Sequence, residues 1–365
     1  MSEIDPRRML IRIGTSMVFA VGGPAMFAKA WGVEGVIQYI LILSVTRFFF
    51  AEFTSWITLQ NPSLGLFAYR WSPSLLALGG FLQILVPQSA LALQMLPVLL
   101  GVYLAAFWTI HHDISEIRGK GTSDYHKTEV FSTVIGTLLL IAVSYLYSIE
   151  VAVAFGGGIS LFALRIPVKV TAEELGSSLK RWNHQARART NQQIKNGTNI
   201  ARSVAAISFC SLSALRIHVF TDPVSIMAGI ISLGAILAGA ELVVWLITNR
   251  ISYENQYLKI GGFIVTIFGF MLMTFGELGL FGVGFFLVTL VSRSVNRTAD
   301  REFARSALRG LSLRPGLRER SKFRMYVLLT PLLWAPNTLP IFGAIAGVML
   351  LRSKFCSPNS DSLEA

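Results

Sequence analysis

The chain has few charged residues and few cysteines for its length. Of its 365 residues only 14% are charged, and 53% are hydrophobic, whereas soluble domains carry about 25% charged residues. Its two cysteines, Cys210 and Cys356, give neither a disulfide framework nor a metal-binding spacing. This composition excludes a soluble globular domain. We therefore expect an all-α protein that crosses a membrane several times.

The common motifs of soluble enzymes are also missing. The sequence contains no Walker phosphate loop, no dinucleotide glycine fingerprint after a strand, no nucleophile elbow and no zinc signature. One cluster resembles a metal site, His111-His112-Asp113. Adjacent histidines on a helix point about 100° apart, so they do not converge on one ion. We expect no catalytic residue, no metal and no cofactor.

Positive charge is distributed asymmetrically between the two sides of the predicted membrane. The net charge is +12, and 29 of the 32 lysines and arginines lie in segments assigned to one side. The connections on the other side are short and contain no lysine or arginine. The positive-inside rule places the basic segments and both termini in the cytoplasm, so we expect a multi-pass protein of the inner (plasma) membrane. Because this charge sets topology, no nucleic acid partner is expected.

Apolar runs of about 20 residues, the length that spans a bilayer, recur along the chain. An eleventh stretch, 325–351, suits one tilted span or two short spans broken between Pro336 and Pro340, and Arg352 and Lys354 favour two because they then lie in the cytoplasm. We predict about twelve transmembrane helices in two six-helix lobes, 1–168 and 203–365, joined by a basic cytoplasmic linker, 169–202. The ten clear runs lie near 10–30, 36–58, 66–86, 91–110, 130–148, 150–168, 203–220, 224–248, 259–274 and 277–292.

The second of these runs follows a short turn, Trp31–Gly35, and carries Arg47 and Glu52 in its interior. A charge at the centre of a span costs about 2.5 to 3.5 kcal/mol on insertion scales, so each side chain should face a partner or a water-filled cavity. Five residues along one helix place Arg47 and Glu52 about 140° apart, which disfavours a direct pair. Arg47 therefore has two open interpretations: a substrate contact in a central cleft, or an ion pair with another helix.

The two halves repeat a pattern of charges, which is typical of transporters built by duplication. In each half a cation near the outer end of the first span is followed by an acid in the turn, and a deeper acid lies 18 or 19 residues after that acid. The residues are Lys29, Glu34 and Glu52 in the first half, and Arg216, Asp222 and Glu241 in the second.

These charges are the candidate functional residues. Arg47, Arg216 and Lys29 are predicted to bind an anionic group of the substrate, although Arg216 and Lys29 can also snorkel to the surface. Glu241 and Glu52 are candidates for proton coupling. The alternative for Glu241 is a neutral acid bonded to a neighbouring helix. A further prediction is a kink in the first span at Pro24.

Four stretches resemble polysaccharide and lipid-linked oligosaccharide flippases of the multidrug/oligosaccharidyl-lipid/polysaccharide exporter superfamily. They are Gly32-Val33-Glu34-Gly35 followed by Tyr39, Ile117-Arg118-Gly119-Lys120-Gly121, Leu215-Arg216-Ile217 running through Asp222, and Gly276-Glu277-Leu278-Gly279-Leu280-Phe281-Gly282. The resemblance implies two six-helix lobes around a cationic cavity that alternately opens to each side. It also implies a lipid-linked sugar as substrate, with membrane lipids and polysaccharide-assembly membrane proteins as partners.

Two other functions stay open. A small-solute transporter of the major facilitator superfamily also has twelve spans and a basic central loop, but its signature between spans 2 and 3 is absent, because this chain reads Gln60-Asn61-Pro62-Ser63-Leu64-Gly65 there. A membrane enzyme acting on lipid-linked sugars usually has a long outer loop for catalysis, and no such loop is predicted. The main expectation is a flippase, with the small-solute transporter as the alternative.

Overall fold

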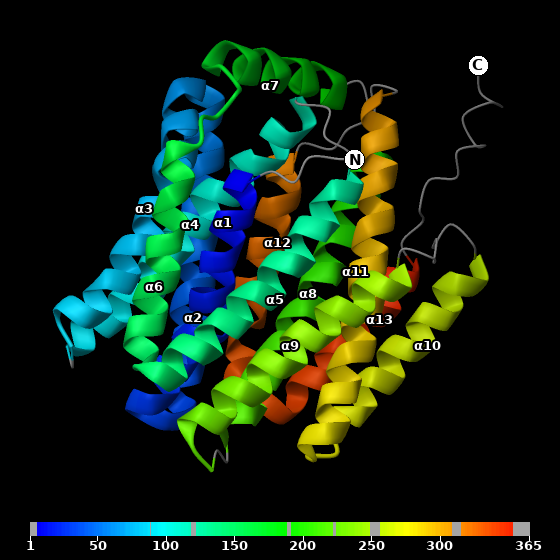
Figure 1. The fold of residues 1–365 in the computed structure, drawn as a ribbon. Coiled ribbons are helices and arrows are strands. Elements are labelled where there is room, and N and C mark those ends of the chain that lie inside the picture. Colours follow the sequence, from blue (N-terminus) through cyan, green and yellow to red (C-terminus); the bar gives the residue numbers. More distant parts are fainter. Residues whose placement is uncertain are drawn as a thin grey trace.

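The computed structural model describes residues 6–87, 89–117, 122–187, 191–221, 224–248, 256–308 and 315–352. Within these ranges every regular element is a helix (Figure 1), which confirms the predicted all-α class. In chain order the elements are α1 (Pro6–Thr15), η1 (Ser16–Gly22), α2 (Gly23–Gln60), α3 (Pro62–Leu85), α4 (Ala90–Ile117), α5 (Thr122–Leu146), α6 (Ile149–Leu161), η2 (Phe162–Arg165), α7 (Ala172–Arg187), α8 (Asn191–Thr221), α9 (Ile226–Thr248), α10 (Gln256–Leu272), α11 (Leu278–Leu308), α12 (Pro315–Leu329), η3 (Thr330–Trp334), η4 (Pro336–Thr338) and α13 (Leu339–Arg352).

Helix α2 contains a sharp turn that divides it into two arms. Trp31 and Gly32 have non-helical backbone angles, and the φ of Gly32 is +61°, which favours glycine because it has no Cβ. Residues on the two sides of this turn are in contact. The ring centroids of Phe27 and Tyr39 lie 5.4 Å apart, and a Cβ on Gly23 would overlap the Tyr39 ring. The chain therefore reverses at the predicted turn, and the second span begins after it.

The described helices account for the predicted number of spans. Six of them are long and apolar enough to cross a membrane, and the one over 6–60 holds two spans because it includes the turn. Two shorter apolar helices are 260–272 and 336–350. With α3, α6 and α12, which pack against the longer helices, the described bundle holds the twelve helical segments that were predicted. The last apolar stretch divides into α12–η3 and η4–α13, as the two-span interpretation predicted.

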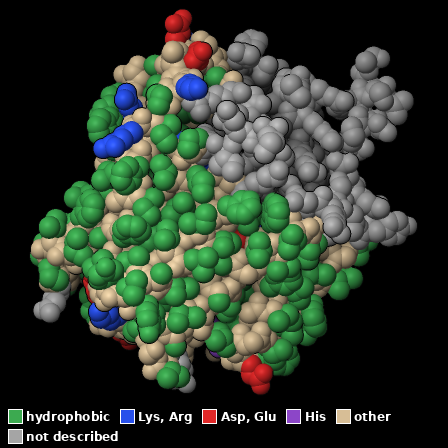
Figure 2. Space-filling model, in the orientation of Figure 1, with side chains coloured by type: hydrophobic (Ala, Val, Ile, Leu, Met, Phe, Trp, Pro, Cys, Tyr) green, Lys and Arg blue, Asp and Glu red, His purple; other side chains and the backbone are tan. Residues whose placement is uncertain are grey.

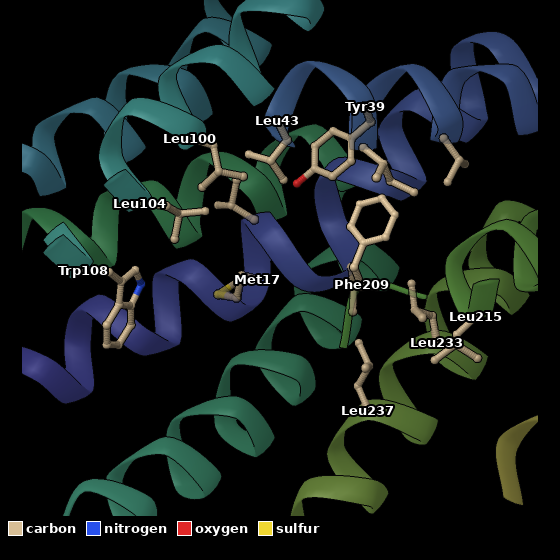
Figure 3. Packing of buried hydrophobic residues seen from close by; sticks show 14 of the residues in the cluster. Met17, Tyr39, Leu43, Leu100, Leu104, Trp108, Phe209, Leu215, Leu233 and Leu237 are labelled. Carbon is tan, nitrogen blue, oxygen red and sulfur yellow. The ribbon is translucent and has the colours of Figure 1, made fainter. Parts of the chain in front are cut away.

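The spans form two groups that meet along the middle of the molecule (Figure 1). Helix α5 packs against α9, and α2 packs against both α8 and α12. We call α1–α6 the first lobe and α8–α13 the second lobe. Their buried apolar side chains belong to one continuous core. Figure 3 shows part of it, with Met17, Leu43 and Leu104 from the first lobe and Leu215 and Leu233 from the second.

The predicted linker, 169–202, contains a helix of its own and the start of another. Helix α7 lies across one end of the bundle (Figure 1). Thr171 and Glu174 exchange hydrogen bonds at its start, which is a capping box that satisfies two free N–H groups. Helix α8 begins at Asn191, earlier than the expected start of the second lobe at 203. Hydropathy detects only the apolar part of a helix and misses its polar extension.

Apolar side chains are spread over the whole described part of the face seen in Figure 2, and charged side chains on it lie mainly toward its upper and lower ends. Large exposed apolar residues occur on helices of both lobes, including Phe49, Leu138, Ile264 and Met349. A continuous apolar surface of this kind is suited to contact with lipid. The protein is a helical, multi-pass membrane protein.

Candidate functional site

The first span is irregular beside the predicted kink at Pro24. Segment η1 is π-helical, and the Gly23 N–H that follows it bonds to the carbonyl of Val18, five residues back. The next residue, Pro24, has no N–H to donate. The helix therefore supplies one donor too few for the carbonyls of Phe19 and Ala20.

Arg216 of α8 donates to both of these carbonyls from the second lobe. Its Nη2 donates to the carbonyl of Phe19 at 2.7 Å, and its Nε donates to the carbonyl of Ala20 at 3.3 Å. The Tyr39 hydroxyl donates to the Phe19 carbonyl as well, at 3.2 Å. Arg216 is only 3% exposed, so it does not snorkel to the surface. It ties the second lobe to the irregular helix of the first.

Arg47 lies in the second arm of α2 among aromatic rings from spans 1 and 11. Its Cζ is 4.5 Å from the ring centroid of Phe323, 5.3 Å from that of Tyr326 and 5.8 Å from that of Phe19. Its Nε is buried without a hydrogen-bond partner, and within the described ranges no residue forms an ion pair with Arg47. The side chain as a whole keeps partial exposure. The predicted pair with another helix is therefore not observed among these residues.

Arg47 and Arg216 approach the same aromatic ring from different lobes. The Phe19 centroid is 5.8 Å from the Cζ of Arg47 and 4.7 Å from that of Arg216. Each cation–π contact is worth about 0.5 to 2 kcal/mol, which partly offsets the cost of bringing two cations close together. The structure thus brings two of the three predicted substrate-binding residues together. We call the following group the cationic centre: Phe19, Tyr39, Arg47, Arg216 and Tyr326.

Lys29 lies apart from the cationic centre, near the turn at Gly32. Its Nζ donates to a carboxylate oxygen of Glu150 at 2.8 Å, and 54% of the Lys29 side chain is exposed. This pair joins α2 to α6 within the first lobe. The structure does not bring Lys29 together with Arg47 and Arg216; Lys29 is instead a largely exposed ion-pair partner of Glu150.

Phe323 of α12 also closes the bundle beside the cationic centre. It packs with Ala51 of α2 and Ala105 of α4, and these three side chains are 0 to 1% exposed. Because α12 belongs to the second lobe and α2 and α4 to the first, this contact joins the lobes. Ala51 lies one turn from Arg47 along α2, on the side of Glu52.

Four charged residues form a chain of ion pairs across the lobes, which we call the four-charge network: Arg12, Glu129, Glu241 and Arg293. In the first lobe Arg12 bonds to Glu129 at 2.7 Å and lies 4.1 Å over the Trp108 ring. In the second lobe Arg293 bonds to Glu241. Arg293 also reaches Glu129 at 3.3 Å, and this bond crosses between the lobes. The side chains of Glu129 and Glu241 are only 7% and 13% exposed.

Sequence reasoning found Glu241 but missed its three companions. The alternative to proton coupling for Glu241 is a neutral acid bonded to a neighbouring helix. Glu241 does bond to a neighbouring helix, but its partner there is the cation Arg293. Arg12 and Arg293 are among the 29 basic residues that the charge distribution assigns to the cytoplasmic side, and Glu129 directly precedes the predicted span at 130–148. For Arg293 one sequence signal was available, because arginine recurs every four residues from 293 to 309, the spacing of one helix face. In the structure α11 continues past Arg293 to Leu308. Asp222, the outer acid of the second repeat, lies outside the described residues.

Glu52 makes a second set of ion pairs between the lobes. Its two carboxylate oxygens bond to Arg324 at 2.9 Å and to Arg320 at 3.3 Å, both on α12. As predicted, Glu52 does not pair with Arg47 on its own helix. The three side chains are 25% to 52% exposed, so water reaches this pair more easily than the four-charge network.

In the described part of the chain no group of three or more His, Cys, Asp or Glu side chains could hold a metal ion. His111 packs instead inside the first lobe. Its ring stacks on Phe107 with a centroid distance of 4.8 Å, and its Nδ1 lies 3.1 Å from the hydroxyl of Tyr69. The side chains of His112 and Asp113 lie outside the described residues.

Comparisons with known proteins show which solved structures share this arrangement of helices. No protein-family model and no curated protein matches the chain. Among solved structures, the fold is similar to the nucleoside transporter NupG, with a TM-score of 0.54 and 12% identity over 94% of this chain and 95% of that one. A variant of the same transporter gives a TM-score of 0.53 and 13% identity over 94% of this chain and 98% of that one. At this identity the likeness shows a common fold over nearly the whole chain.

Proposed function

We propose that the protein is a secondary transporter that moves a small solute across the membrane by alternating access. The observation that carries the proposal is the position of the cationic centre, which is built from both lobes and lies beside their contacts. Movement of one lobe against the other would therefore change access to Arg47 and Arg216. The likeness in fold to a nucleoside transporter supports the same function.

In the described conformation the bond between Glu129 and Arg293 joins the lobes at one end of the bundle, which the positive-inside rule assigns to the cytoplasm. Opening this end must break the bond between Glu129 and Arg293. The pairs Arg12–Glu129 and Arg293–Glu241 lie within single lobes and can persist. Each buried acid then keeps one cation, which limits the cost of separation, because an unpaired buried charge is expensive.

Opening the opposite end requires Arg216 to leave the carbonyls of Phe19 and Ala20, since these groups belong to different lobes. Arg216 lies about 8 Å along α8 from its last residue, Thr221, at 1.5 Å per residue. Once released, its N–H groups are free to bind a solute that enters from that side. Opening of this end therefore also frees the N–H groups of Arg216 within the cationic centre.

Glu241 is the better of the two candidates for proton coupling. It shares Arg293 with Glu129, so its protonation would remove one of two acids from that arginine and change the bonds between the lobes. Glu52 is more exposed and is held by two arginines of α12. Coupling through Glu241 requires uptake driven by a proton gradient, and the Glu241→Gln variant should lose that dependence.

Transport by purified protein in liposomes tests the proposal. Counterflow is measured with radiolabelled uridine, chosen because of the fold likeness, and with panels of sugars, amino acids and organic acids. Accumulation of one solute class that is lost in Arg47→Gln would support the proposal. Arg165→Gln is the matched control, because Arg165 also lies over an aromatic ring, Phe162, but is exposed at the end of the first lobe. Folded protein that accumulates no solute would refute the proposal.

A lipid-linked oligosaccharide flippase is the second candidate function. An open apolar groove of about 590 Å³ between α9 and α11 favours it, because a lipid tail needs an apolar surface beside the helices. Its lining includes Ile236, Gly239, Ala240 and Phe286. This proposal includes an inner-membrane location and polysaccharide-assembly proteins as partners. A deletion strain that loses a surface glycan and accumulates its lipid-linked precursor would support a flippase, whereas unchanged glycans and precursors would count against it.

A further inference from the structure

Arg47 differs from four other arginines in the interior of the bundle because it forms no hydrogen bond or ion pair among the described residues. Its Nε is fully enclosed. Four other arginines each bond to a carboxylate or to backbone carbonyls: Arg12, Arg216, Arg293 and Arg320. Since an unmatched cation inside a membrane protein is costly, a ligand that neutralises Arg47 would explain its presence.

The surroundings of Arg47 leave its terminal nitrogens available. The rings of Phe323 and Tyr326 lie 4.5 Å and 5.3 Å from its Cζ, so aromatic faces surround the guanidinium. Of its three nitrogens only Nε is buried and unbonded, and the residue is partly exposed. The terminal nitrogens are therefore accessible. Their N–H groups lie in the guanidinium plane, in the fork geometry that binds a carboxylate or a phosphate through two hydrogen bonds.

The buried acid Glu319 does not form an ion pair with Arg47 and bonds to another cation. Glu319 is buried on α12, one turn before Phe323, and bonds to Lys322 at 3.0 Å. It is not within ion-pair distance of Arg47. A structural arginine in this bundle binds acids or carbonyls, as Arg216 does, and Arg47 does neither among the described residues. A role in ligand binding accounts for this difference.

We propose that Arg47 binds the carboxylate or phosphate of a small organic anion, and that the neighbouring rings contact an apolar part of the same molecule. Phe209 of α8 stacks on Tyr326 with a centroid distance of 5.7 Å, which extends the group of aromatic rings within the second lobe. Arg216, beyond the Phe19 ring, adds a second positive charge. The inference rests on the proposed transporter function and names the class of its substrate.

Binding to full-length purified protein in detergent, measured by calorimetry and thermal shift, tests this inference with pairs of probes, each an anion and a neutral analogue. The pairs are benzoate against benzamide, and benzyl phosphate against benzyl alcohol, which separate carboxylate from phosphate chemistry. At least one anion should bind tenfold or more tightly than its neutral partner, since hydrogen bonds to an ionised acceptor are about twice as strong. Arg47→Gln should abolish the preference, Arg47→Lys should keep part of it, and Arg165→Gln should leave it unchanged.

Arg47→Gln removes an unpaired charge, so it should fold at least as well as the parent protein, and Arg47→Lys provides the test if it does not. Equal binding of anion and neutral partner, binding of none of the four probes, or a preference that survives Arg47→Gln would each overturn the inference. Anion binding without transport in liposomes would refute the proposed function and leave the site intact. Transport of neutral solutes without anion binding would refute the anion site at Arg47 and leave the proposed transporter function intact.

Discussion

Replacing Arg293 by glutamine should open the end of the bundle that the four-charge network closes. Arg293 is the residue through which this network crosses between the lobes, by its bond to Glu129 at 3.3 Å. In Arg293→Gln, Glu129 keeps Arg12 as its partner in both conformations. Glu241 loses its partner Arg293 in both conformations alike, so this loss does not favour either one. The substitution therefore acts on the conformational equilibrium mainly through the lost bond between the lobes.

The size of the effect follows from the geometry of this pair. Two unit charges 3.3 Å apart interact by about 5 kcal/mol at an effective dielectric constant of about 20. The Arg293 side chain is 35% exposed, and Glu129 is already neutralised by Arg12. Both facts reduce the net contribution of the bond between Glu129 and Arg293 to about 1.5 kcal/mol, a value between those of exposed and of buried ion pairs. The open conformation should become about tenfold more populated.

A cysteine at Ala105 reports this opening. Ala105 is 0% exposed in its contact with Ala51 and Phe323, which joins the lobes. In a background where Cys210 and Cys356 are serine, Ala105→Cys should react with a maleimide about ten times faster when Arg293→Gln is added. Arg165→Gln should leave the rate unchanged. A folded Arg293→Gln protein that reacts at the background rate would refute the role assigned to the network.

Three further predictions concern the other contacts. Glu52→Gln removes the second set of bonds between the lobes, so the factor by which it raises the labelling rate at Ala105→Cys should multiply the factor for Arg293→Gln. A double variant that is labelled no faster than either single variant would show that the two sets of bonds act as one. Arg216→Gln should lower the free energy of unfolding by about 1 to 3 kcal/mol. Adding Pro24→Ala should recover part of this loss because alanine supplies a backbone N–H, and chemical denaturation of the single and double variants measures both effects. Gly32→Ala meets no neighbouring atom but must adopt a φ of +61°, so it should cost about 1 to 3 kcal/mol through backbone strain alone, and an unchanged unfolding curve would contradict this reasoning.

The sequence alone determined the elements of this protein. Apolar runs of membrane length predict the spans, because a helix satisfies its own backbone within one segment. The turn at Gly32 and the irregularity beside Pro24 are equally local, since they depend on the backbone chemistry of glycine and proline. The cost of charge in a span also identifies Arg47 and Glu241 as residues that need an explanation.

The partners of these charges were decided only by the tertiary structure. Glu241 bonds to Arg293, 52 residues away, Glu129 bonds to Arg12, 117 residues away, and Arg216 bonds to the carbonyl of Ala20 across 196 residues. Hydropathy and charge counts show how far along a helix a residue lies but not which helix it faces. Arginines at the predicted cytoplasmic end therefore look alike in the sequence. Helix packing pairs Arg12 and Arg293 with buried acids, and it leaves Arg47, in the interior of the second span, without an ion-pair partner among the described residues.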